Sequence, residues 1–397
     1  MVEIVDKLVF QDLEFFRKSD GLKVVFLKNF FFELTEQDLK PLGEFIIEKQ
    51  SIILKESCSA KLHRLIDRGF MHLKNKNTGR PTVYVHQNSG IPLIGSNYFG
   101  IIERNTNLIE LRPITGCNLN CIHCSVNEPG EKQVDYVVEK DYLIKEFRKL
   151  VKFKGEDDIE AHLNGQGEPL MYSPMPELIK ELKSTPGCVK ISIDTHGLIL
   201  TEELVDKLAD SGLDQINLSI NTLDKRKACE MAGTSYDLEH VVRMAYYIPK
   251  RMSLLLAPIW LPGVNDSGVE EIIELAKKLR AKIGIQNYFE HKYGRRPIKQ
   301  ASMETFHNWL RSLEKKHGIK LILDENDFNI HKTKPLPKPF KKGEIIIAKS
   351  VCPGRQKHEV LAVYKNRVIQ VHGTDKLGNI RAKIIRDKHN IFYGIKR

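Results

Sequence analysis

Apolar and polar positions alternate in a regular way from about residue 107 onward. Six short apolar runs have the composition of buried strands: LIELRP, DIEAHLN, VKISIDT, QINLSI, SLLLAPIW and IGIQNYF. Between them lie amphipathic stretches that predict helices, such as EKDYLIKEFRKLVKF and GVEEIIELAKKLRA. Repeated strand–helix units predict a parallel sheet with helices outside it. Six units favour a partial barrel over the closed eight-fold form.

The pattern changes at both ends of the chain. Residues 1–100 contain a short helical stretch followed by strand-like runs around NKNTGR, which predicts an α+β accessory region resembling a winged helix. Residues 331–342 are rich in Pro and Lys and predict a linker that lets the following part act as a separate module. Residues 343–397 contain closely spaced short strands, typical of a small β-barrel. An α/β core over residues 101–330 is therefore expected between two accessory parts.

Length and composition narrow the class of protein. The chain has 397 residues, of which 41% are hydrophobic, so it can bury at least one large core. No segment approaches the roughly 18 apolar residues of a membrane span. The N-terminus lacks the basic segment and small-residue cleavage site of a signal peptide. We expect a cytoplasmic protein with no membrane partner, in which disulfides are disfavoured.

The positive charge is concentrated in the C-terminal part. The whole chain carries a formal charge of +11, and residues 341–397 hold 14 Lys/Arg against 4 Asp/Glu, which gives +10. Such a cluster predicts a polyanionic partner, most simply nucleic acid. The alternative is a solvated basic surface without a partner. Tyr364 and Tyr393 are candidates to stack on bases, whereas Phe392 is expected in the barrel core.

Three of the seven cysteines lie in the stretch RPITGCNLNCIHCSVNEPG, directly after the first predicted strand of the core. Chemistry in parallel β/α folds gathers at the carboxyl ends of strands. Cys117, Cys121 and Cys124 have the spacing C-x3-C-x2-C. Three thiolates can hold three irons of a [4Fe–4S] cluster and leave the fourth open to another ligand. The alternative is a zinc site with His123 or His196 as the fourth ligand, although the spacing fits zinc poorly.

The stretch CNLNCIHC resembles the signature of the radical S-adenosylmethionine (SAM) superfamily. LNGQGEPLMY, ISIDTHG and INLSINT resemble further motifs of that family, in its order and each at a predicted strand end. The resemblance covers roughly residues 107–300. It implies a partial (β/α)6 barrel that holds a [4Fe–4S] cluster on the three cysteines and cleaves SAM reductively to a 5′-deoxyadenosyl radical. It also implies these SAM contacts: Gly165, Gly167, Glu168, Thr195, Ser219, Asn221 and Asn287.

Two residues are candidates for a catalytic role. His196 either lines the substrate side or is a satisfied structural histidine, and both interpretations stay open. The stretches GQGEPL and SIN most resemble the branch with rRNA and tRNA adenine methylating enzymes, which use two further cysteines. Cys352 is the candidate for one of them, and no upstream partner is evident.

The sequence thus predicts a radical SAM iron–sulfur enzyme that modifies RNA, most simply tRNA. Its C-terminal part resembles a TRAM-like or OB-like RNA-binding barrel. An electron donor such as ferredoxin or flavodoxin is an expected partner. Two alternatives are kept: a radical SAM enzyme that modifies a protein or a cofactor precursor, and a non-enzymatic zinc-containing RNA-binding protein.

Overall fold

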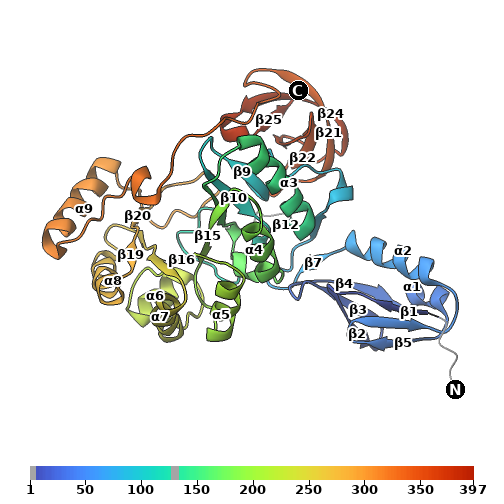
Figure 1. Ribbon diagram of the computed structural model, residues 1–397. Helices are drawn as coiled ribbons and strands as arrows, with labels where there is room; N and C mark the ends of the chain where they lie inside the picture. The colour runs from blue at the N-terminus through green and yellow to red at the C-terminus, as the bar shows by residue number, and fades with distance from the viewer. Residues whose placement is uncertain (1–5, 127–133) are drawn as a thin grey trace.

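The computed structural model describes residues 6–126 and 134–397, and a seven-stranded sheet forms its centre (Figure 1). Six strands are parallel, as the sequence predicts, and β9 adds an antiparallel edge beside β10. The partial β/α barrel is therefore confirmed. The strand order across the sheet is β19 (Lys282–Ile283), β17 (Ser253–Leu256), β16 (Gln215–Leu218), β15 (Cys188–Thr195), β13 (Ile159–Leu163), β10 (Leu108–Arg112) and β9 (Gly100–Glu103).

The two faces of this sheet differ in polarity. Along β15, Ile191 and Ile193 are fully buried, whereas Ser192 and Asp194 alternate with them and point to the other face. The apolar face packs on helices, and the polar face lines the inside of the partial barrel. The helices of the core are α3 (Lys140–Lys154), α4 (Met175–Lys183), α5 (Glu202–Asp210), α6 (Lys225–Ala232), α7 (Leu238–Tyr247), α8 (Asp266–Leu279) and α9 (Met303–His317).

Local sequence signals set the ends of these helices. The hydroxyl of Thr201 accepts a hydrogen bond from the Leu204 N–H at the start of α5, and Ser302 caps α9 in the same way. Helix α3 ends at Gly155, whose φ of 73° is the left-handed conformation that glycine adopts most easily. Helices α3 and α8 lie within two residues of the stretches that the sequence predicts, whereas α6 and α9 were not predicted.

The N-terminal region is an α+β unit set to one side of the core (Figure 1). Helix α2 (Ser59–Phe70) is followed by β7 (Lys74–Asn75) and β8 (Thr82–Val85), which is the helix-then-strands order that the sequence predicts. Strand β8 pairs in parallel with β12 (Asp135–Val138) and joins the unit to the core. The preceding elements were not predicted: β1 (Asp6–Val9), β2 (Leu13–Lys18), β3 (Gly21–Phe26), β4 (Phe30–Thr35), α1 (Glu36–Leu39), β5 (Phe45–Glu48) and β6 (Ser51–Leu54).

The C-terminal part is a closed five-stranded barrel, which confirms the predicted β-barrel. Phe392 is fully buried in its core, as expected, beside Phe340 from the end of the Pro/Lys stretch. Tyr364 packs partly against the same core. Around the barrel the order is β21 (Ile345–Pro353), β22 (Glu359–Tyr364), β23 (Arg367–His372), β25 (Tyr393–Lys396) and β24 (Gly378–Arg386).

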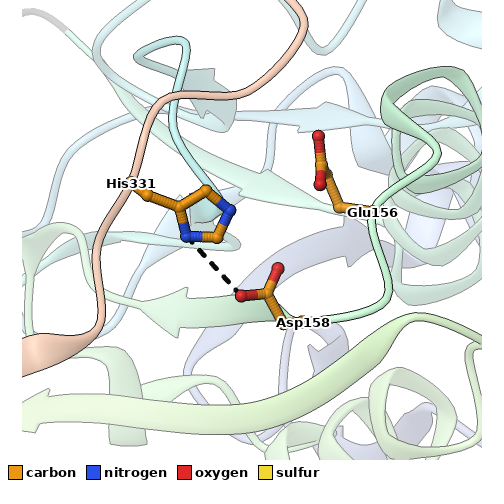
Figure 2. A group of neighbouring side chains, drawn as sticks. All are labelled: Glu156, Asp158 and His331. Atoms are coloured by element: carbon orange, nitrogen blue, oxygen red, sulfur yellow. Dashed lines mark ion pairs between the residues drawn. The ribbon is translucent and has the colours of Figure 1, made fainter.

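The start of the Pro/Lys stretch is hydrogen-bonded to the core at His331. Asn107 and His331 exchange hydrogen bonds, because the Asn107 N–H donates to the His331 carbonyl and its Oδ1 accepts from the His331 N–H. The imidazole Nδ1 lies 3.6 Å from Asp158 Oδ2, with Glu156 beside them (Figure 2). Groups of exposed side chains of this kind occur often without an ion. We therefore assign Asp158 and His331, together with Asn107, a structural role in holding the stretch.

The barrel is also bound to the core, and its action as a separate module stays a prediction. The hydroxyl of Tyr98 donates to the buried carboxylate of Glu359 at 2.9 Å. The hydroxyl of Tyr136 donates to the Pro353 carbonyl at 2.8 Å, and the Phe392 N–H donates to the Gly95 carbonyl at 2.9 Å. Buried hydrogen bonds across the junction fix the barrel relative to the sheet.

In the described part of the chain, every helix is too short or too polar to cross a bilayer. The cytoplasmic location stays a prediction.

Candidate functional site

One cavity of about 870 Å³ lies at the carboxyl ends of the parallel strands, and we call it the reaction cavity. It brings together nearly all the residues singled out from the sequence, although they come from different strand ends and loops. Cys352 is the exception. The predicted residues that line the cavity are Cys117, Cys121, Cys124, Gly165, Gly167, Glu168, Thr195, His196, Ser219, Asn221 and Asn287.

The cysteine loop supplies three half-buried sulfur ligands. All three cysteines are free thiols, and the Leu119 N–H points at Cys117 Sγ from 3.4 Å. Burial raises the pKa of Cys117 to about 12 and that of Cys121 to about 11. A bound metal ion stabilises the thiolate form and therefore lowers the pKa of the thiols that bind it. In the described residues no fourth cysteine lines the cavity. The donor set therefore fits a cluster with one open iron.

His123 lines the same cavity, and its Nδ1 is buried with no hydrogen-bond partner among the residues that the structure describes. Burial lowers the pKa of its imidazole to about 4, which keeps the ring neutral. Because His123 lies in the cavity with the three cysteines, its position alone leaves the zinc alternative open.

The GQGE loop packs tightly against the cysteine loop. Strand β14 (Gln166–Gly167) pairs in parallel with β11 (Thr115–Gly116), directly before the first cysteine. A Cβ on Gly167 would lie 1.9 Å from the Gly116 carbonyl oxygen, and one on Gly165 would lie 3.0 Å from that of Ile114. Only glycine fits at Gly167, so its absent side chain is what lets the two loops meet.

Glu168 is 2% exposed and held by several donors. Its Oε1 accepts from the Leu170 N–H at 3.0 Å, and its Oε2 accepts from the His196 N–H at 3.0 Å. The imidazole Nε2 of His196 lies 3.2 Å from the same Oε2. A carboxylate accepts about four hydrogen bonds, so acceptor positions beyond those taken by the two backbone N–H groups are left for a ligand. The expected role toward an ammonium group fits this geometry.

His196 is placed as a structural link. The Leu198 N–H donates to Nδ1 at 3.2 Å, so the ring proton lies on Nε2, which donates to Asn118 Oδ1 at 2.8 Å. The Tyr236 hydroxyl donates to the His196 carbonyl. These bonds connect the cysteine loop to the end of β15. They favour the structural interpretation of His196 over the catalytic one.

The remaining predicted contacts lie at the ends of neighbouring strands. Thr195 is buried, and its carbonyl accepts from the Ser219 N–H at 2.8 Å. Asn221 Oδ1 accepts from the Ile259 N–H, which leaves its amide NH₂ available. Asn287 donates to the Ala301 carbonyl, while its Oδ1 is buried with no partner among the described residues. A buried acceptor without a donor is costly, which fits a site completed by a ligand.

Arg355 was missed from the sequence. It comes from the loop between β21 and β22, is 3% exposed and lines the cavity. Its Nη1 donates to the carbonyl and side-chain oxygens of Gln166, and its Nη2 lies 3.1 Å from Asp135 Oδ1. Asp135 also accepts from the Thr115 hydroxyl at 3.1 Å. A barrel residue thus braces β11 and β14 beside the cysteine loop. Arg355 lies 189 positions from Gln166 in the sequence, so no local motif predicts their contact.

Cys352 does not join the other predicted residues. It is buried, and burial raises the pKa of its thiol to about 12. It is absent from the described lining of the cavity. Arg80 lines the cavity from the N-terminal unit and was not predicted either.

Comparisons with known proteins agree with this geometry. Residues 111–276 match the model of the radical SAM superfamily, a range that includes the three cysteines. An uncharacterized protein of Methanocaldococcus jannaschii is 41% identical over 356 residues, which cover 81% of this chain and 82% of the relative. The GTP 3′,8-cyclase of Chlorobaculum tepidum is 29% identical over 198 residues, 49% of this chain and 56% of the relative. The structure of Streptococcus suis SuiB bound to precursor peptide SuiA has a TM-score of 0.43 at 15% identity, covering 80% of this chain and 72% of that one.

Proposed function

The chain belongs to the radical SAM superfamily, and on that premise we propose that it is an enzyme of RNA modification, with tRNA as the simplest substrate. Members of the superfamily are enzymes that use a [4Fe–4S] cluster and SAM, so the alternative of a non-enzymatic zinc protein does not hold. Cluster and SAM supply the radical chemistry when bound. The residues that line the cavity bind and orient them.

The C-terminal barrel carries the charge that supports an RNA partner. We define its outer face as Ile345, Ile347, Lys349, Arg381, Lys383 and Ile395. Strand register places these side chains together, since Ile345 pairs with Lys383, Ile347 with Arg381, and Lys383 with Ile395. In the described part of the chain, none of the three basic side chains forms an ion pair. Unpaired basic groups on one face suit a phosphate backbone.

The observation that carries the proposal is the position of the barrel beside the reaction cavity. Arg355 of the barrel lines the cavity, and Tyr293 of the core lies 6.3 Å from the ring of His372 in the barrel. The barrel therefore contributes directly to the wall of the cavity. The expected base-stacking role of Tyr393 finds little support, because its ring is stacked on His372 at 5.9 Å.

A protein substrate is the second candidate. The outer face exposes Ile345 at 51%, Ile347 at 67% and Ile395 at 44%. Contiguous exposed apolar side chains are typical of protein-binding surfaces. RNA binding distinguishes the two candidates directly. The electron donor and the TRAM or OB type of the barrel stay predictions.

A salt titration of tRNA binding tests the proposal. The test variant is Lys349→Gln/Arg381→Gln/Lys383→Gln, and the matched control carries Gln at three exposed lysines far from the barrel: Lys278, Lys282 and Lys315. Each lost phosphate contact lowers the slope of log K against log salt by roughly 0.7 to 0.9. We expect a slope lower by about 2 in the test variant and unchanged in the control. Equal slopes in both variants would contradict binding through the outer face, and absence of RNA binding by the native protein would favour the protein substrate.

A further inference from the structure

A second cavity of about 450 Å³ adjoins the reaction cavity inside the partial barrel. Asp194 and Gln286 line both, so the two cavities share a boundary. We call the second one the lower chamber. It lies against the polar face of the sheet and is covered by α9 and by residues 321–330. Its volume falls in the range of ligand-binding pockets.

The lower chamber has one polar wall and one apolar wall. One wall is formed by hydrogen-bonding side chains of β13, β15 and β16, among them Asp194, Gln215 and Asn217. The facing wall is apolar and includes Phe306 and Leu310 of α9. A flat ring with polar edges matches both walls, because its faces contact apolar groups while its edge meets donors and acceptors.

The polar wall is held in a fixed arrangement. His162 Nδ1 lies 2.8 Å from Ser192 Oγ, and Ser192 donates to Glu160 Oε1 at 2.5 Å. His162 Nε2 lies 3.2 Å from Asp194 Oδ2, and Asn217 donates to Asp194 Oδ1 at 2.9 Å. These contacts orient the Asp194 carboxylate, whose side chain still has 44% of its surface exposed toward the two cavities. Asp194 is thus a preorganised acceptor at the boundary.

Gln286 supplies an amide at the same boundary. Its side chain makes no hydrogen bond within the described residues, so both its donor and its acceptor are available to a ligand. Asp194 also directly precedes Thr195, which lines the reaction cavity. A ring that meets Asp194 and Gln286 therefore has one edge next to the reaction cavity.

We propose that the lower chamber receives a nucleobase turned out of its strand, with the ring against Phe306 and its polar edge at Asp194 and Gln286. The inference rests on the proposed function and names the part of RNA that enters. Enzymes that act on a base take it out of the stack into a pocket that contacts its edge and its faces. The two walls of the lower chamber provide those two kinds of contact.

The intrinsic tryptophan fluorescence of the chain can report on this binding. Its two tryptophans, Trp260 and Trp309, stack with ring centroids 4.2 Å apart, and Phe306 lies 5.7 Å from Trp260. A ring bound against Phe306 changes the surroundings of this stack. Tryptophan emission of the full chain is titrated with AMP, CMP, GMP and UMP, and with ribose 5-phosphate as a control that lacks a base. We expect a saturable change with at least one nucleotide and none with ribose 5-phosphate.

Substitution of Gly284 separates the lower chamber from other sites. Gly284 lines it, and a Cβ there meets Leu255 at an ordinary 3.5 Å, so a larger side chain grows into the chamber. We expect Gly284→Leu to weaken nucleotide binding at least tenfold and Gly284→Ala to keep it. Gln286→Leu, which removes no hydrogen bond within the described residues, is the second test and is expected to weaken binding several-fold.

The outcomes separate this inference from the proposed function. The nucleobase chamber is overturned if none of the four nucleotides changes the tryptophan emission. It is also overturned if Gly284→Leu and Gln286→Leu bind nucleotide as tightly as the native protein. Both results hold even if tRNA binds the barrel. Nucleotide binding that Gly284→Leu abolishes, in a protein that does not bind RNA, supports the chamber and overturns the RNA proposal.

Discussion

Charged side chains are arranged in opposite ways around the reaction cavity and on the outer face of the C-terminal barrel. Around the cavity, Arg355 meets Asp135 with both side chains at least 97% buried, and Glu168 accepts hydrogen bonds from two backbone N–H groups. On the outer face, Arg381 and Lys383 have no acidic partner among the described residues. A buried charge needs a partner because water cannot reach it, whereas an exposed charge does not. Partnered charges therefore hold the cavity together, and unpartnered ones are left for a ligand.

The largest expected effect separates the cavity cysteines from the cysteine of the barrel. Cys121→Ala is expected to abolish assembly of a complete [4Fe–4S] cluster, because an iron loses its thiolate ligand. Cys352→Ala is the matched control and should keep the cluster, since Cys352 does not line the cavity. Iron and sulfide analysis of anaerobically prepared protein measures both. Full iron content in Cys121→Ala would remove this cysteine from the ligand set.

The next effect compares two arginines of the barrel. Arg355→Met leaves Asp135 buried without its cationic partner, which costs about 3–5 kcal/mol in the free energy of unfolding. Arg381→Met removes an exposed side chain and is expected to change stability by less than about 0.5 kcal/mol. Urea denaturation of both variants gives the comparison. The double variant Arg355→Met/Asp135→Asn should recover part of the loss, and equal stability of both single variants would contradict a role for the ion pair.

Arg355 also shows where prediction from the sequence ends. The cysteines, the strand-end motifs and the barrel strands lie in contiguous stretches, where spacing and periodicity reveal them. Arg355 and Arg80 reach the cavity from the barrel and the N-terminal unit, and only the three-dimensional arrangement brings them there. The structural role of His196 depends on the hydrogen bond that its Nε2 donates to Asn118 Oδ1 and on the one that its Nδ1 accepts from the Leu198 N–H, which pattern alone does not assign.

A smaller effect concerns pH and the buried carboxylate of Glu110. Although burial opposes ionisation, Arg112 and Arg104 lower the pKa of Glu110 to about 2. A lowered folded-state pKa stabilises the fold above the ordinary value of 4.5, and this contribution is lost as pH falls from 4.5 toward 2. We expect native apoprotein to lose about 3 kcal/mol more than Glu110→Gln between pH 6 and pH 2. Urea denaturation across this range measures it, and parallel pH profiles would show that Glu110 is not responsible.

The smallest effect tests whether a partnered charge in the cavity also serves a ligand. Glu168 has acceptor positions left beside its two backbone donors, and it faces the cavity. Loss of a charge-assisted hydrogen bond to the SAM ammonium costs about 1.5–3 kcal/mol, or roughly ten- to a hundred-fold in affinity. Glu168→Gln keeps the shape and much of the hydrogen bonding to the neighbouring loop, so iron content should be unchanged. Equilibrium dialysis with SAM measures the affinity. Unchanged affinity with normal iron would limit Glu168 to the structural role that its bonds to Leu170 and His196 already show, because those bonds do not depend on SAM.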